Sequence, residues 1–302
     1  MSSFADDIKS PFKTGNSVGQ LIVINVSVFM VLVIFQFILT ISGFPPDESS
    51  SVFHRAVSWI ALPMHFNELL YKPWTFITYM FVHYSLWHIF GNMLMLFVFG
   101  KIFQEYASSK RVFAVYMYGA LIGALLALVT YQFIPTFKLH APADFMVGAS
   151  AGVMAIVLAA ATLVPDYVLH LLLIGQVRLK YIALFVVVLD MIGVTYFNNA
   201  GGHISHLGGA LFGYVFVAQM KKGTDLSSGF NNLTFRLKKI FNRKSKIKVV
   251  HKRSISDEEY NLKRKIRQEE IDEILDKISS SGYESLTKKE KEILFKASNE
   301  NK

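Results

Sequence analysis

The sequence predicts an all-α membrane protein, with six transmembrane helices in one bundle and a small helical tail. Hydrophobic residues make up 52% of the 302 residues, and 26 of them are phenylalanine. The mean hydropathy is +0.38. Long uncharged apolar runs recur up to residue 220, as in chains that cross a bilayer. Beyond that point the chain becomes basic and polar, which marks the start of the tail.

The apolar runs define the predicted elements in order. The polar segment 1–20 lacks the apolar core and cleavage site of a secretory signal. The run 21–41 is uncharged and long enough to cross the hydrocarbon as a helix. The mixed segment 44–75 carries prolines, charges and aromatic residues, which predicts an ordered loop at the membrane interface. Five more spans are predicted at 84–100, 112–134, 145–164, 181–198 and 203–220.

Basic residues in the short connections predict the orientation of the bundle. Residues 1–220 hold ten basic and nine acidic side chains. One set of loops carries Lys9, Lys13, Lys101, Lys110, Arg111, Arg178 and Lys180 and leads into the basic tail, whereas the opposite set holds Arg55, Lys72 and Lys138. By the positive-inside rule we expect both termini to be cytoplasmic. The second, fourth and sixth spans then run from the outer face inwards.

The tail divides into a linker, 221–255, and a predicted helical hairpin, 256–302. Residues 221–253 hold eleven basic residues and one acid directly after the last span. This position favours contact with anionic lipid, and an ordinary solvated linker explains it equally well. A nucleic-acid partner is not expected. Two capping boxes, Ser256 with Glu259 and Thr287 with Glu290, predict the starts of the two tail helices.

Four polar residues inside the predicted spans converge on one depth. Polar groups in the bilayer are costly, so each requires a reason. His88 and Asn92 lie one helical turn apart near the outer end of the second span, Ser150 near that of the fourth, and His206 near that of the sixth. Because these three spans all begin at the outer face, the four residues are expected to form one site.

The chemistry of these residues suggests a serine hydrolase. A serine hydroxyl needs an adjacent base, and His206 can accept the proton of Ser150 and later return it to the leaving group. Asn92, His88 and the Ser150 N–H can stabilise the oxyanion. Small residues would allow the helices to approach closely at Gly148, Gly152, Gly209 and Gly213.

Each residue also has a structural interpretation. Gly-x-Ser-x-Gly in a membrane helix is more often a packing motif than a catalytic one, and a single histidine or asparagine usually serves structure. Asp190 is expected near mid-bilayer, deeper than Ser150 and His206, with a structural hydrogen bond. His203 competes with His206 for the role of base, and His83 is expected to pack under a loop. Neither a metal nor a cofactor is expected, because the histidines lack ligand spacing and the chain has no cysteine.

Together these motifs resemble the rhomboid family of intramembrane serine proteases. That family has His-x-x-x-Asn on its second span, Gly-x-Ser opening its fourth and His-x-x-Gly-x-x-x-Gly on its sixth. They correspond here to His88 and Asn92, to Gly148 and Ser150, and to His206, Gly209 and Gly213. The resemblance covers roughly 20–220 and implies a rhomboid-like six-span fold. It also implies a Ser150–His206 dyad without an acid.

Three positions depart from the pattern of the family. Ala151 follows the serine where rhomboids usually have glycine, and its methyl group could crowd the oxyanion site. Met154 stands where many members have a tyrosine that packs on the catalytic histidine. Thr75 follows Trp74 where many have arginine. None of these changes removes a reacting group.

The sequence therefore predicts an endopeptidase that cleaves transmembrane protein substrates in or beside the bilayer, near the outer face. A bacterial inner membrane is the expected location, because the tail resembles the extensions of some bacterial rhomboids. A weakly active or inactive rhomboid-like binder of transmembrane helices is the alternative. A transporter or channel is a third hypothesis, for which Asp190 alone speaks.

Overall fold

The computed structural model describes residues 10–12, 14–140, 145–172, 174–196, 199–230 and 257–300. The chain forms two compact units, residues 1–242 and 243–302. The elements of the first unit are α2 (Ser17–Ile41), α3 (Pro46–Val57), β1 (Leu62–Pro63), α4 (Phe66–Tyr71), α5 (Thr75–Thr78), η1 (Tyr79–Phe81), α6 (Leu86–Tyr106), α7 (Ser109–Phe133), α8 (Pro135–His140), β2 (Phe145–Met146), α9 (Ser150–Leu163), β3 (Val168–Leu171), β4 (Gly175–Arg178), α10 (Leu179–Thr195) and α11 (Ala200–Lys221).

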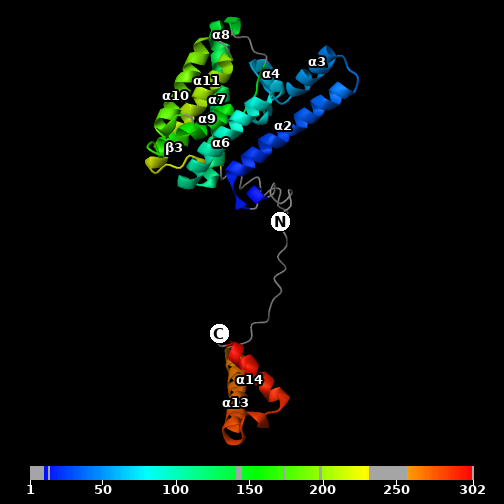
Figure 1. Ribbon diagram of the computed structural model, residues 1–302, viewed down its shortest axis with the longest axis vertical. Coiled ribbons are helices and arrows are strands. Elements are labelled where there is room, and N and C mark those ends of the chain that lie inside the picture. Colours follow the sequence, from blue (N-terminus) through cyan, green and yellow to red (C-terminus); the bar gives the residue numbers. More distant parts are fainter. Residues whose placement is uncertain are drawn as a thin grey trace. The chain divides into compact units, whose positions relative to one another are not determined.

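The first unit is a helical bundle with α9 at its centre. Ten of the 14 residues of α9 are buried, and α6, α7, α10 and α11 all pack against it. Figure 1 shows α8 at one end of this bundle and β3 at the other. Within the described residues, α2, α6 and α7 are the helices long and apolar enough to cross a membrane by length and composition. The fold is thus that of an all-α membrane protein.

The central helix is too short to cross the bilayer by itself. Its 14 residues extend about 21 Å at about 1.5 Å per residue, whereas the hydrocarbon layer is about 30 Å thick. The span predicted for 145–164 is therefore wrong at its start. Phe145 and Met146 form strand β2, and the helix begins only at Ser150. As a result, the first residue of α9 lies inside the bundle next to a cavity.

The segment between α2 and α6 supports this early start of α9. It contains α3, β1, α4, α5 and η1, in agreement with the prediction of an ordered loop. Strand β1 pairs antiparallel with β2, with Leu62 opposite Met146 and Pro63 opposite Phe145. The N–H of Gly148 then donates to the carbonyl oxygen of Tyr79 at 3.0 Å. These bonds hold the connection before Ser150 in an extended form.

Close contact between α9 and α11 depends on two glycines. A side chain at Gly209 would collide with the carbonyl oxygen of Ala151, and one at Gly213 with that of Ala155. Because glycine has no Cβ, the backbones of the two helices touch at both levels. The predicted role of Gly209 and Gly213 in bringing the sixth helix to the fourth fits this packing.

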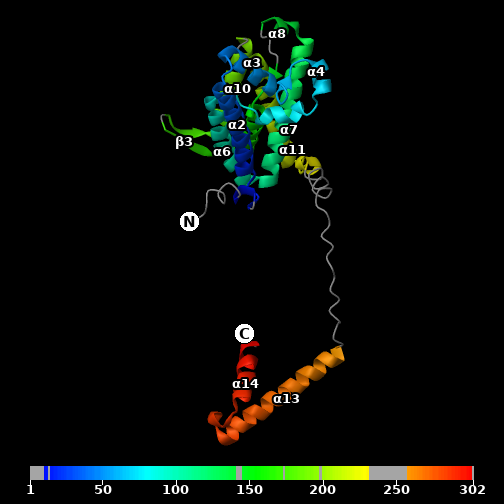
Figure 2. The same ribbon diagram turned by 90° about the vertical axis from the view of Figure 1, so that its right-hand side faces the viewer.

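A β-hairpin that was not predicted connects α9 to α10. Strands β3 and β4 pair antiparallel from Val168 with Arg178 to Leu171 with Gly175. Asp166 binds Lys180 at 2.7 Å and Arg178 at 3.2 Å at the base of the hairpin. Figure 2 shows the hairpin projecting from one side of the bundle. Its apolar run, Leu169 to Ile174, gave no alternating pattern from which strands could be predicted.

The second unit contains two helices, α13 (Asp257–Ser281) and α14 (Lys288–Glu300), joined through η2 (Tyr283–Ser285). At the start of α14, the Thr287 N–H donates to Glu290 Oε2 at 2.6 Å, and the Glu290 N–H to Thr287 Oγ1 at 3.4 Å. This reciprocal pair is a capping box. Ser256 and most of the linker 221–255 lie outside the described residues.

Candidate active site

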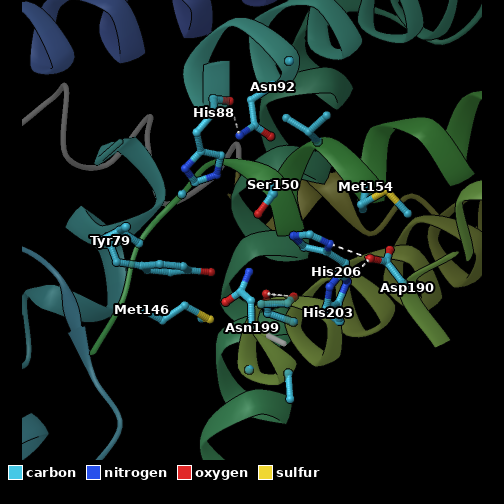
Figure 3. Close-up of a pocket in the computed structure, with 18 of the residues that line it drawn as sticks. Tyr79, His88, Asn92, Met146, Ser150, Met154, Asp190, Asn199, His203 and His206 are labelled. Carbon is cyan, nitrogen blue, oxygen red and sulfur yellow. Dashed lines mark hydrogen bonds and ion pairs between the residues drawn. The ribbon is translucent and has the colours of Figure 1, made fainter. Parts of the chain in front are cut away.

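Ser150 is the first residue of α9 and lines a cavity of 860 Å³. The first N–H groups of a helix have no partner within it. Hence the Ser150 N–H is available to an acceptor, and the positive end of the helix dipole lies at the same point. Figure 3 shows the hydroxyl of Ser150 directed into the cavity towards His206.

The base expected from the sequence, His206, lies on α11 and lines the same cavity. Its Nδ1 faces away from Ser150 and pairs with Asp190 Oδ1 at 2.8 Å (Figure 3). Among the described side chains, no hydrogen bond joins Ser150 Oγ to His206. Catalytic hydrogen bonds are often long in the free enzyme and shorten when substrate binds. The two residues therefore share a cavity without being bonded in this state.

His88 lies against the glycine that precedes the serine motif. A Cβ at Gly148 would come within 2.9 Å of His88 Cε1 and 3.0 Å of His88 Nε2. The same glycine has a φ of 129°, a conformation that other residues rarely adopt. Gly148 therefore lets both the chain turn and the imidazole of His88 come next to Ser150.

The amide of Asn92 is already engaged in the described structure. Its Nδ2 donates to the carbonyl oxygen of His88 at 3.0 Å and lies 3.4 Å from His83 Nε2. The expected donation from Asn92 to an oxyanion would thus require one of these bonds to be exchanged. Both His88 and Asn92 line the cavity.

His83 has a more specific place than the sequence suggested. It is 1% exposed, and its Nε2 lies 3.5 Å from the N–H of Ala149 as well as near Asn92. Both of these neighbours are donors, so Nε2 acts as the acceptor for them. His83 thus ties the start of α6 to the connection before α9. No periodic pattern indicates such a role, because the residue lies in an irregular segment.

Asp190 lies beside the site and forms a hydrogen bond, as the sequence predicted. Its Oδ1 lies 2.8 Å from Nδ1 of His206 and 2.7 Å from Nδ1 of His203. The residue lies five positions before the end of α10 at Thr195 and lines the cavity. The sequence did not indicate that the partners of Asp190 would be these two histidines.

Asp190, His203 and His206 form a cluster that is joined by hydrogen bonds in the structure. Each Nδ1 approaches the same carboxylate oxygen to 2.7–2.8 Å. The three side chains also offer one possible ligand atom each within 4.8 Å of one another, so their chemistry would suit a metal ion as well as a hydrogen-bonded network.

Gly152 allows a close helix contact, and the neighbour that it admits is α7. A Cβ there would meet the carbonyl oxygen of Tyr116 at 2.7 Å and the Tyr116 ring at 2.9 Å. It therefore permits α9 to approach α7, whereas Gly209 and Gly213 serve the contact with α11. The three residues of the Gly-x-Ser-x-Gly stretch thus have different surroundings. Gly148 contacts His88, Ser150 faces the cavity, and Gly152 contacts α7.

Comparison with known proteins now identifies the family. A model described as the Rhomboid domain matches residues 71–222, half of the chain. The chain belongs to the rhomboid family. Rhomboids are in general serine proteases of the membrane, although some members are inactive. A second model, described as a family of unknown function (DUF6576), matches residues 254–300, which include both helices of the second unit.

Curated rhomboids from plants and animals resemble the first unit. The RHOMBOID-like protein 12, mitochondrial, of Arabidopsis thaliana is 27% identical over 157 residues, 49% of this chain and 47% of the relative. Rhomboid-related protein 2 of Mus musculus is 36% identical over 106 residues, 32% of each chain. Presenilin-associated rhomboid-like protein A, mitochondrial, of Danio rerio is 28% identical over 139 residues, 45% of this chain and 35% of the relative. The chain thus spans less than half the length of these curated relatives.

Two of the departures from the rhomboid pattern have visible substitutes. Met154 lines the cavity beside His206 (Figure 3), where many rhomboids have tyrosine, and its flexible thioether fills the space. At the position of the arginine, the buried Thr75 donates its hydroxyl to the carbonyl oxygen of Lys72 at 2.6 Å, and the Lys72 ammonium lies 5.0 Å over the ring of Trp59. The rings of Trp59 and Trp74 stack at 6.3 Å, and the Trp74 N–H donates to the Trp59 carbonyl oxygen at 2.7 Å.

Proposed function

We propose that this chain is an intramembrane serine endopeptidase that hydrolyses peptide bonds in or beside the transmembrane segments of other proteins. The observation that carries the proposal is that Ser150, at the free end of α9, and His206 line one cavity with His88. Ser150 is the nucleophile, and His206 takes its proton and returns it to the leaving amine. Membership of the rhomboid family supports this assignment.

The Ser150 N–H and the His88 ring donate hydrogen bonds to the oxyanion. Asn92 can donate a third one if its Nδ2 gives up its hydrogen bond to the His88 carbonyl oxygen or to His83. Each such donor contributes about 3–4 kcal/mol in other serine hydrolases. The cavity volume of 860 Å³ is ample for an unwound peptide segment and water. Substrates with small or helix-breaking residues near the membrane surface should be preferred, because a helix hides its carbonyl groups.

Six membrane crossings follow from the same proposal. Helices α9, α10 and α11 join α2, α6 and α7, with α9 completed by the extended residues before Ser150. The basic loops support cytoplasmic termini, and a bacterial inner membrane remains our proposal for the location.

The domains we propose are a protease core at 21–220, a basic linker at 221–255 that contacts anionic lipid, and a cytoplasmic helical hairpin at 256–302.

The proposal is tested with purified full-length protein and a model transmembrane substrate in liposomes. Ser150→Ala and His206→Ala should each lower the cleavage rate by at least about a thousand-fold. The matched controls are Ser58→Ala, a half-buried serine in the segment between α2 and α6, and His170→Ala, an exposed histidine on β3. Cleavage by either site variant at the wild-type rate would refute the assigned pair.

An inactive binder of transmembrane helices is the competing function, favoured by the lack of a Ser150–His206 hydrogen bond in this state. A fluorophosphonate probe separates the two, because it reacts only with an activated serine. Labelling of wild type but not of Ser150→Ala supports the protease. A folded wild type that binds a helix without being labelled supports the binder.

A further inference from the structure

Helices α10 and α11 contact each other at two places, one helical turn apart. Asp190 and Gly193 lie three residues apart on α10, as do His203 and His206 on α11, so each pair shares a helix face. A Cβ at Gly193 would collide with the ring of His203. The ring of His203 thus rests on the backbone of α10, and both histidines reach the carboxylate beside it.

One oxygen of Asp190 accepts two hydrogen bonds. Its Oδ1 lies 2.7 Å from His203 Nδ1 and 2.8 Å from His206 Nδ1. A carboxylate can only accept, so both Nδ1 atoms carry a hydrogen. Asp190 is 4% exposed, and its Oδ2 has no partner among the described protein atoms. Such a desolvated carboxylate interacts strongly with any positive charge nearby.

We propose that Asp190 is a positioning residue for His206, so that the site works as Ser150, His206 and Asp190 rather than as a pair. This proposal rests on the proposed protease function. The hydrogen bond to Asp190 keeps the proton of neutral His206 on Nδ1 and leaves Nε2 bare on the side that faces Ser150 (Figure 3).

The proton balance of the reaction follows from this arrangement. Ser150 Oγ forms a bond to the scissile carbonyl carbon while its proton moves to His206 Nε2. The imidazolium that results keeps its Nδ1–H on Asp190, whose charge it offsets. The proton then passes from Nε2 to the leaving amine as the C–N bond breaks, which leaves Ser150 acylated and His206 neutral. A water molecule next gives its proton to Nε2 as its oxygen attacks the acyl carbon, and that proton returns to Ser150 Oγ as the carbon–Oγ bond breaks.

His203 has a separate task in this arrangement. It donates to the same oxygen as His206, and its ring is fixed by Gly193. It thereby holds the carboxylate in place against His206. Figure 3 shows the ring of His203 on the side of His206 that faces away from Ser150, so it is not placed to take the proton of the serine.

The first test is Asp190→Asn in the full-length protein, measured on the model substrate and with the fluorophosphonate probe. We expect kcat to fall about a hundred-fold, with KM changed less than about two-fold, and the labelling rate to fall by the same factor as kcat. Asp166→Asn, which removes an exposed carboxylate at the base of the β3–β4 hairpin, is the matched control. Wild-type kcat in Asp190→Asn would overturn the proposal.

A double-mutant cycle distinguishes a positioning role of Asp190 from a purely structural one. In the His206→Ala background, Asp190→Asn should change the residual labelling rate less than about two-fold, because the group it positions is gone. An equal additional loss in that background would assign Asp190 to the fold and overturn the proposal. His203→Phe should cost less than Asp190→Asn, and a greater loss would make His203 the base instead.

A second measurement does not depend on activity or on the folding of a variant. In ¹⁵N-histidine-labelled wild type, the Nδ1 of His206 should give the signal of a protonated ring nitrogen and Nε2 that of a bare one. The opposite tautomer would overturn the positioning role. Wild type that shows the expected tautomer but neither cleaves nor reacts would contradict the protease function and leave the hydrogen-bonded arrangement intact.

Discussion

Ala151 stands where rhomboids usually have glycine, and its methyl group is accommodated away from the reacting atoms. A Cβ added to Gly123 of α7 would lie 2.8 Å from the Ala151 Cβ, so the methyl group points at α7. Ala151 is buried and is not part of the cavity wall. The crowding of the oxyanion site that the sequence suggested therefore does not arise from this side chain.

Ala151→Gly should leave kcat and KM within about two-fold of wild type. It should also lower the free energy of unfolding by about 0.5–1 kcal/mol, because glycine adds conformational entropy to the unfolded chain and leaves Gly123 without its contact. The measurements are cleavage kinetics and reversible denaturation in mixed micelles. A ten-fold gain in kcat would show that the methyl group does limit the site.

The four candidate residues and Asp190 differ in how far the sequence could place them. Ser150, His206, His88 and Asn92 lie near the starts of predicted spans, so counting residues along the predicted topology brings them together. A hydrogen bond of Asp190 was predicted but its two histidine partners were not, because they depend on how closely α10 approaches α11 at Gly193. Close approach of two helices is a property of their side-chain sizes in three dimensions, and no single-sequence pattern reports it.

Among the elements, α9 is positioned by backbone contact rather than by large side chains. Gly209 and Gly213 on one side and Gly152 on another bring α11 and α7 to its backbone. The pattern of glycines predicted this close packing and the approach of the sixth helix to the fourth through Gly209 and Gly213, but not that Gly152 meets α7. The extended β1–β2 pair was not predictable, since each strand has two residues and no periodicity.

Gly209→Ala should destabilise the bundle by about 1–3 kcal/mol, because its new Cβ must displace the carbonyl oxygen of Ala151. That displacement also shifts the start of α9, so kcat should fall more than ten-fold. Thermal denaturation and cleavage kinetics provide the measurements. The stability control is Gly91→Ala on α6, where a Cβ meets no atom within 4 Å and stability should be kept or slightly raised.

The capping box of α14 should make the second unit sensitive to acid. The hydrogen bond from Lys277, followed by those from Thr287, lowers the pKa of Glu290 to about 2. A group with a lowered pKa contributes stability above its unfolded pKa, about 4.5, and loses that contribution as the pH falls towards about 2. Because Glu290 is at the surface, the effect is modest.

Hydrogen exchange of α14, expressed as protection factors, should therefore decrease as the pH falls through this range. In Glu290→Gln the protection should be lower at neutral pH and nearly independent of pH. Glu292→Gln, which removes only an exposed pair with Lys296, is the matched control. Because glutamine can still form a capping box, unchanged protection in Glu290→Gln would mean that the charge of Glu290 does not stabilise the start of α14.

At the scale of the whole molecule, all candidate site residues belong to the first of two compact units. The cavity is lined by residues from Met64 to His206, and the second unit begins after residue 242. The basic composition of the tail and its capping signals predicted a separate unit. They could not predict its function, because neither helix carries a recognisable catalytic or binding motif.

A chain ended at residue 242 should cleave the model substrate with kcat and KM within about two-fold of the full-length protein, since no lining residue is lost. The comparison uses both proteins in liposomes of the same lipid composition. A loss greater than ten-fold would indicate that the second unit regulates the first. Repeating the comparison with an anionic lipid would then show whether the tail responds to the bilayer.

The central position of α9 also has a consequence during synthesis. The ribosome completes Ser150 well before Ala200, where α11 begins, so under the proposed mechanism the serine is made before its base, His206. Activity would then begin only once α11 has packed against α9, and we expect incomplete chains not to cleave neighbouring proteins. An arrested chain ending at residue 195 should accordingly fail to react with the fluorophosphonate, whereas one ending at residue 242 should react.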